Sequence, residues 1–225
     1  MTLSVLCVLR SGGDYDAHWV RKLRDGVARN LSIPHRFACL TDVPVPCEHI
    51  RLRHDWPGWW SKIELFRPGV IEGPTLYLDL DTVITGALDR LADLPYAFAM
   101  LRGFGRKHYV GSGVMWFRRP FFHVYENFLT RGPERVMAEY ASNPGSPGPG
   151  RHGAYKAARG DQAWIFDEMG GQAIPRLTDD LPGMIRLYGR GVGREVPEGC
   201  SVVCFKGRLK PPDARGTGWL ERCWS

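Results

Sequence analysis

Two aspartates, Asp79 and Asp81, follow a short apolar run that begins at Thr75, directly after Gly73-Pro74. An apolar run of this length, bounded by turn residues, predicts a buried strand in the first half of the stretch 75–85, and the two aspartates break the run in the second half. Residues two apart on an extended chain point to the same side, so both carboxylates can converge on one ligand. Two uncompensated anions beside a buried strand are costly, and hard oxygen ligands without a nearby His or Cys favour magnesium or manganese. A strand end with two solvated aspartates explains a bare Asp-x-Asp at least as well, so the surrounding chain must decide.

The composition is that of an ordinary globular chain: of its 225 residues, 44% are hydrophobic and 24% are charged. This length fits a single domain over residues 1–225 with a substantial core. There is no apolar run of about 18 residues, so no membrane span is predicted. The first residues lack the basic region and cleavage site of a secretory signal. The six cysteines, several of them within apolar runs, therefore predict reduced thiols and a cytoplasmic protein.

The charge balance favours an anionic small ligand. Lysine and arginine exceed aspartate and glutamate by 30 to 24, which gives a net charge of +6. Such an excess suits a nucleotide diphosphate. The basic residues are spread along the chain without the blocks typical of nucleic-acid binding, so no nucleic-acid partner is predicted. Nothing in the pattern indicates an oligomeric state.

The elements that must position the two aspartates alternate between strands and helices, which predicts an α/β fold with an open sheet. Helices are recognised by apolar residues at helical spacing, as at Val20, Leu23 and Val27, and strands by short apolar runs. The expected strands cover residues 3–9, 35–40, 49–53, the first half of 75–85, 96–101, 108–117, 173–177 and 185–187, and a last strand runs into a basic turn within 202–211. The expected helices cover residues 16–31, 59–66, 88–94, 121–130 and 133–141, and a further one begins at residue 160. The Pro- and Gly-rich stretch 143–153 predicts a mobile surface loop within the same domain.

Two segments before the central strand carry residues that could meet an anion. The Gly-rich turn Arg10–Tyr15 follows the first strand, where α/β proteins place nucleotides, although a plain strand-to-helix turn explains it equally well. Lys62 lies on a short helix, off the apolar stripe formed by Trp59, Ile63 and Phe66. Lys62 could reach a ligand at the aspartates, but periodicity alone favours a surface lysine.

Two segments after the central strand are also informative. Gly111-Ser112-Gly113 interrupts an apolar strand, and glycine within a strand often marks close approach by a ligand or another backbone. Asp161 opens a helix, where its simplest role is that of an N-cap.

Taken in order, these pieces resemble the GT-A glycosyltransferases, and most closely the glycogenin-like and lipopolysaccharide galactosyltransferase-like group known as family eight. The resemblance covers roughly residues 3–211, and its strength lies in the order of the pieces rather than in any one of them. The matching pieces are Arg10–Tyr15, Lys62, Tyr77–Asp81, Gly111–Met115, Asp161–Gln162 and Cys204–Pro211.

The resemblance implies a single GT-A domain, Rossmann-like, with a mixed, mainly parallel central sheet flanked by helices. It implies transfer of a sugar from a nucleotide-diphosphate sugar, commonly a UDP-sugar, to an acceptor, with retention of configuration. Mn²⁺ or Mg²⁺ would be held by Asp79 and Asp81, and Lys62, Asp161 and Gln162 would act on the donor sugar and its diphosphate. The implied donor-binding residues are Leu9, Arg10, Ser11, Asp14, Tyr15, Lys62, Asp79, Leu80, Asp81, Ser112, Gly113, Lys206, Gly207 and Lys210.

One position departs from the family. The third metal ligand of the family is a His in the terminal turn, and here the alignment places Cys204 there, or Lys206 after a shift of two residues. Cysteine is a poor ligand for a hard cation, whereas a lysine could replace the charge of the metal with its own. His108 or His152 could substitute for the missing ligand.

Two other functions fit parts of the sequence. The segment Leu78–Val83 also matches the first motif of haloacid-dehalogenase-type phosphatases, in which Asp79 would be the nucleophile and Asp81 the general acid. Asp179 and Asp180 would complete a magnesium site, but that family places the motif on its first strand. A non-catalytic nucleotide-sugar-binding protein is the other alternative, suggested by the missing His.

Overall fold

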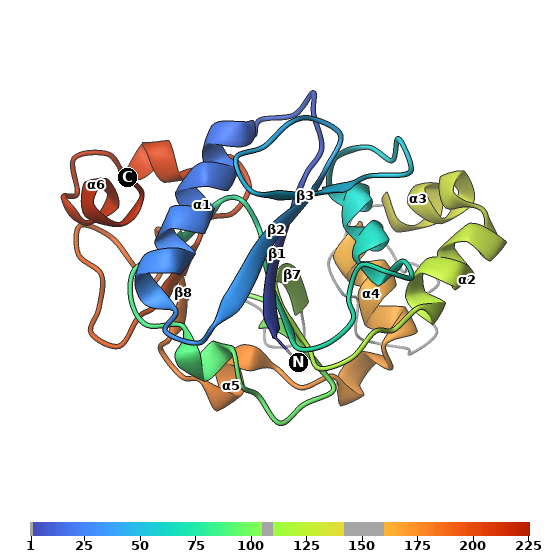
Figure 1. The fold of residues 1–225 in the computed structure, drawn as a ribbon. Helices are drawn as coiled ribbons and strands as arrows, with labels where there is room; N and C mark the ends of the chain where they lie inside the picture. The colour runs from blue at the N-terminus through green and yellow to red at the C-terminus, as the bar shows by residue number, and fades with distance from the viewer. Residues whose placement is uncertain (1, 105–109, 142–159) are drawn as a thin grey trace.

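The computed structural model describes residues 2–104, 110–141 and 160–225. The predicted loop at 143–153 lies outside these ranges. The central sheet has six strands in the order β3-β2-β1-β4-β7-β6 (Figure 1). Their bounds are β1 (Leu3–Leu9), β2 (His35–Thr41), β3 (Glu48–Arg51), β4 (Thr75–Leu78), β6 (Phe98–Arg102) and β7 (Val110–Phe117). Strands β3, β2, β1 and β4 pair in parallel, while β7 is antiparallel to both β4 and β6. The predicted mixed, mainly parallel sheet is therefore confirmed.

Helices cover both faces of this sheet, α1 on one side and α2, α3 and α4 on the other (Figure 1). The α-helices are α1 (Ala17–Asn30), α2 (His123–Arg131), α3 (Pro133–Ala141), α4 (Asp161–Glu168), α5 (Leu177–Asp180) and α6 (Trp219–Cys223). The 3₁₀ helices are η1 (Gly58–Phe66), η2 (Asp89–Leu91), η3 (Gly171–Ala173) and η4 (Pro211–Ala214). Within the described ranges, no helix has the length and apolar character needed to cross a bilayer.

Strand β1 shows how sequence alternation builds the two layers. Val5 and Cys7 pack in the same cluster as Val20 of α1, whereas Leu6 and Val8 pack in the cluster of the opposite face. Successive side chains of a strand point to opposite faces, so an uninterrupted apolar run produces a strand buried on both sides. Burial of both faces fixes the register of β1 at the centre of the sheet.

The strand predicted in the first half of the stretch 75–85 is confirmed as β4, and the second half holds a further strand in a different sheet. β4 belongs to the large sheet, and β5 (Thr82–Ile84) belongs to a three-stranded sheet with β8 (Ile185–Leu187) and β9 (Val202–Cys204). The chain turns between them, because the amide of Thr82 donates to the carbonyl of Asp79 at 3.1 Å. The prediction that the two aspartates share a side of an extended strand is therefore wrong.

Helix η1 also differs from its prediction. The α-helical spacing predicted a buried stripe of Trp59, Ile63 and Phe66, but the segment is a 3₁₀ helix with three residues per turn. Trp60, Ile63 and Phe66, which are three residues apart, are buried, and so are Ser61, Glu64 and Leu65. Trp59 is 50% exposed and shares its side of the helix with Lys62.

Two smaller predictions are corrected, and the end of a third element is located. The expected strand 173–177 is replaced by η3 and the start of α5, and only an isolated bridge joins Met100 to Arg176. The last strand expected within 202–211 ends at Cys204, and a turn containing Gly207 follows it. The expected helix 88–94 shrinks to η2.

Candidate functional site

The two aspartates lie where the sheet topology reverses. From β1 the chain passes to β2 and β3 on one side, and then returns to β4 on the other side of β1. Neighbouring carboxyl ends whose connections diverge leave a crevice, which is the usual ligand site in open α/β sheets. Tyr15 follows β1, and Asp79 and Asp81 follow β4, so the structure brings these three predicted residues to that crevice.

Asp79 is held by a lysine and a tyrosine. The Lys62 ammonium lies 2.8 Å from Oδ1 and 3.0 Å from Oδ2 of Asp79, and the Tyr77 hydroxyl donates to Oδ1 at 2.6 Å. The same ammonium lies 5.8 Å from the centre of the Tyr77 ring, within the range of a cation–π contact. Lys62 is therefore a buried partner of the site rather than the surface lysine that periodicity favoured.

Asp81 is held in the same manner by residues from the two ends of the chain. The Lys210 ammonium and the Tyr15 hydroxyl both donate to Oδ2 of Asp81, at 2.9 Å and 2.7 Å. Lys210 also lies 4.9 Å from the centre of the Tyr15 ring. Lys210 is the N-cap residue of η4, and its amide donates to Asp213 Oδ2 at 2.7 Å, so its backbone is fixed beside the site.

A third carboxylate, that of Asp161, lies beside the same Lys62 ammonium as Asp79. Its Oδ2 atom accepts a hydrogen bond from Ser112 Oγ at 2.6 Å and lies 3.5 Å from the Lys62 ammonium. The predicted N-cap role is wrong, because Gly160 is the N-cap and Asp161 is the first residue of α4. The side chain of Asp161 instead faces the sheet, where it is 6% exposed.

We call Asp79, Asp81, Asp161, Lys62 and Lys210 the Asp–Lys cluster. Burial raises the pKa of Asp161 and, together with the neighbouring Asp79 charge, raises that of Asp81. Burial alone would lower the pKa of Lys62, but the Asp161 and Asp79 carboxylates outweigh it and raise that pKa. Three carboxylates and two ammonium groups thus lie in a partly dehydrated crevice, where charge acts strongly on a bound ligand.

Glycines keep the neighbouring space open. A Cβ at Gly113 would lie 3.3 Å from Oδ2 of Asp79, and one at Gly111 would lie 3.9 Å from Oε1 of Gln162. The Gly111-Ser112-Gly113 segment therefore lies beside Asp79 and Gln162, and its role in lining a sugar pocket stays a prediction.

Arg10 and Ser11, at the start of the Gly-rich turn after β1, are bound by a residue that sequence reasoning missed. The Arg10 guanidinium contacts Oδ2 of Asp42, and the Ser11 amide donates to Oδ1 of Asp42 at 2.9 Å. Asp55 lies 3.4 Å from the other end of the same guanidinium. Asp42 directly follows β2, the neighbour of β1. This position could have identified Asp42, because the carboxyl ends of neighbouring parallel strands meet at one edge of the sheet.

Some of the remaining predicted donor-binding residues are buried and others are exposed. The side chains of Leu9 and Leu80 pack in the core, so only their backbone can meet a ligand. Asp14, Lys206 and Gly207 are exposed. Tyr77 was missed as a site residue, although its position two residues before Asp79 was a usable signal.

The donor chemistry at Asp79 and Asp81 fits a hard divalent cation as a partial ligand set, because both supply carboxylate oxygens. Cys204 ends β9 opposite Thr82, and burial together with the Asp81 charge raises the pKa of its thiol. In the described ranges, no three His, Cys, Asp or Glu side chains are placed to hold a metal ion. A cation here would therefore take its other ligands from water or a bound anion. His108 and His152, the suggested substitutes, lie outside the described residues.

The two aspartates that the phosphatase alternative assigns to a magnesium site contact other residues instead. Asp179 forms an ion pair with Arg102 at 3.0 Å, and Asp180 hydrogen-bonds to Tyr96. Neither completes a metal site with the aspartates after β4. The motif also follows the fourth strand in chain order rather than the first.

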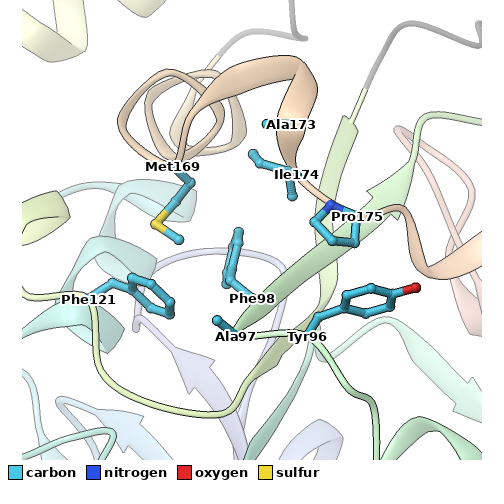
Figure 2. Close-up of a pocket in the computed structure, with 8 residues that line it drawn as sticks. All are labelled: Tyr96, Ala97, Phe98, Phe121, Met169, Ala173, Ile174 and Pro175. Carbon is cyan, nitrogen blue, oxygen red and sulfur yellow. The ribbon is translucent and has the colours of Figure 1, made fainter.

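A separate hollow of about 270 Å³ lies beside the edge strand β6 (Figure 2). Its lining is Tyr96, Ala97, Phe98, Phe121, Met169, Ala173, Ile174 and Pro175. Apolar side chains dominate, and no member of the Asp–Lys cluster takes part. This hollow therefore has no charged group with which to bind a diphosphate.

Comparison with known proteins identifies the fold. Neither the family models nor the curated proteins give a match to this chain. Among solved structures, the glycosyltransferase GlyE of Streptococcus pneumoniae TIGR4 matches with a TM-score of 0.61 and 14% identity, over 98% of this chain and 59% of GlyE. An active-site mutant of LgtC matches with a TM-score of 0.59 and 11% identity, over 97% and 94% of the two chains. The bifunctional glycosyltransferase WbbM matches with a TM-score of 0.62 and 12% identity, over 98% of this chain and 49% of WbbM.

These likenesses confirm the predicted GT-A-like glycosyltransferase fold. The chain spans 59% of the length of GlyE and nearly all of LgtC. A shared fold does not by itself carry an activity, which has to be argued from the site.

Proposed function

We propose that this chain is a glycosyltransferase that moves a sugar from a uridine diphosphate sugar to an acceptor, with retention of configuration. The observation that carries the proposal is the Asp–Lys cluster at the switch point of the sheet. A solved structure of LgtC, a galactosyltransferase, is a complex with donor and acceptor sugar analogues, and this supports a two-substrate reaction on the fold. Residues 1–225 act as one catalytic domain in this proposal.

The reaction needs the charges that the cluster offers. Breaking a glycosyl–phosphate bond builds positive charge on the sugar carbon and negative charge on the departing diphosphate. Groups fixed where charge develops stabilise the transition state most. In this proposal the Lys210 ammonium, which contacts Asp81, binds the diphosphate. Bound Mn²⁺ or Mg²⁺, held by Asp79 and Asp81, would supply further neutralisation of the leaving group.

The donor sugar belongs, in this proposal, on the side of β7 and α4. Gly111 and Gly113 leave room for it, and Asp161 and Gln162 orient its hydroxyl groups. The LgtC mutant carries its substitution in the active site, which agrees with a functional role for side chains in this fold. Lys62 acts by holding Asp79 and Asp161 in place.

The base and ribose belong at the turn after β1. Ser11 and Arg10 are fixed by Asp42, so the exposed turn is organised before any ligand binds. Asp14 and Tyr15 extend it toward the cluster. Cytoplasmic location stays a prediction, supported by six cysteines that form no disulfide with one another.

The proposal is tested by measuring UDP release from UDP-glucose, UDP-galactose and UDP-N-acetylglucosamine with Mn²⁺. We expect at least one donor to turn over, and Asp81→Asn to lower the rate by about 100-fold or more, as for loss of other preorganised charged groups. Asp93→Asn is the control, because this exposed aspartate lies outside the cluster. Phosphate release from p-nitrophenyl phosphate without UDP release would favour the phosphatase. Binding of UDP without turnover of any donor would favour the non-catalytic alternative.

A further inference from the structure

Lys210 occupies the position at which a cation neutralises Asp81. Its ammonium shares Oδ2 of Asp81 with the Tyr15 hydroxyl, at 2.9 Å and 2.7 Å. The Asp81 side chain is only 12% exposed, so water alone cannot compensate its charge. A divalent cation that reaches Asp81 must therefore displace this lysine or share the Asp81 carboxylate with it.

The two lysines of the cluster differ in exposure and in the number of carboxylates that they contact. Lys62 is 12% exposed and contacts Asp79, Asp161 and Ser112 together. Lys210 is 22% exposed and has Asp81 as its one carboxylate partner among the described residues. Lys210 therefore has fewer carboxylate contacts to lose than Lys62 when another anion is offered.

The net charge of the cluster indicates when displacement of Lys210 from Asp81 is favourable. The cluster holds three carboxylates and two ammonium groups, a net charge of −1. The diphosphate of a nucleotide sugar adds two negative charges, and a divalent cation restores the original balance. Diphosphate and cation therefore favour each other's binding, while the cation alone competes with Lys210.

We propose that Lys210 is an internal cation that holds Asp81 in the nucleotide-free protein and is exchanged for a divalent metal ion when the donor diphosphate binds. The inference rests on the proposed function, because it takes the donor to carry a diphosphate. The absence of the family's third metal ligand then has a consequence. The nucleotide-free protein binds the metal ion weakly, and the metal ion binds together with the nucleotide. Lys210 moves from the carboxylate of Asp81 to the diphosphate.

The test is the affinity of the full chain for Mn²⁺, followed by the loss of the free Mn²⁺ electron paramagnetic resonance signal. For the wild type we expect weak binding of Mn²⁺ alone and at least tenfold tighter binding with saturating UDP, within the usual range of coupling between linked sites. Lys210→Gln should bind Mn²⁺ alone about tenfold more tightly than the wild type. Lys210→Arg, which keeps the charge, should resemble the wild type.

Arg208→Gln is the control, since it removes one positive charge from an exposed position on the same turn and is not among the predicted donor-binding residues. Equal Mn²⁺ affinity of Lys210→Gln and Arg208→Gln would overturn the proposal. So would a wild-type Mn²⁺ affinity that UDP leaves unchanged, or UDP binding with no Mn²⁺ bound in any variant. If no nucleotide binds, the proposed function fails, but the comparison of Mn²⁺ affinities without UDP still decides the role of Lys210.

Discussion

Replacing Lys62 by methionine should lower the free energy of unfolding by about 3–5 kcal/mol, the cost of breaking a buried ion pair from one side. The variant leaves Asp79 and Asp161 facing each other without the ammonium that lies 2.8 Å and 3.5 Å from them. For a chain of this length the loss corresponds to a melting temperature lower by about 6–20 °C. Urea unfolding of the variant and the wild type measures it.

The double variant Lys62→Met/Asp161→Asn should recover much of that stability, because it removes one of the two stranded carboxylates. It should not recover transfer, since Asp161 belongs to the proposed donor-sugar side. Lys206→Met controls for loss of a lysine at an exposed position. A Lys62→Met protein that unfolds at the same urea concentration as the wild type would show that Lys62 does not hold the cluster together.

Gly160→Ala should destabilise the protein through two separate effects. Gly160 has a φ of +81°, in the left-handed region, and a Cβ there would lie 2.5 Å from Nε1 of Trp59. The backbone effect costs roughly 1–2 kcal/mol. The collision must move either the Trp59 indole or the start of α4, which carries Asp161, so donor turnover should fall as well.

Gly170→Ala is a control for positive φ without a collision, because Gly170 has a φ of +93° and nothing within 4 Å of an added Cβ, although its ψ of 15° differs from the −152° of Gly160. Thermal unfolding should show a larger loss for Gly160→Ala than for Gly170→Ala. The excess should shrink when Trp59→Ala is added to Gly160→Ala. Equal losses in the two glycine variants would mean that the indole yields freely and that Asp161 is not displaced.

Local patterns predicted the layers of the fold. Alternation along β1 separates Val5 from Leu6, and the spacing of Val20 and Leu23 identifies the buried side of α1. Both patterns depend on neighbours in sequence, which the chain itself displays. The order of chemical motifs carried the fold resemblance that the solved structures confirm.

Pairings over long distances in sequence could not be predicted. The second half of the stretch 75–85 forms β5, which pairs with β9 more than a hundred residues later, and no local signal shows this. Local patterns also do not show that Asp81 meets Tyr15 and Lys210, which only the family resemblance had grouped together. The error at Trp59 has another cause: a helical period of 3.6 was assumed where the chain follows a period of three.

The most direct test of a nucleotide site at this cluster is the melting temperature of the full chain with UDP and Mn²⁺. A ligand at about 100 times its dissociation constant stabilises the folded state by about 2.7 kcal/mol, which is about 5–11 °C for this length. We expect such a rise for the wild type, a smaller rise with UDP alone, and none for Asp81→Asn. A melting temperature that UDP leaves unchanged, with and without Mn²⁺, would contradict the donor site.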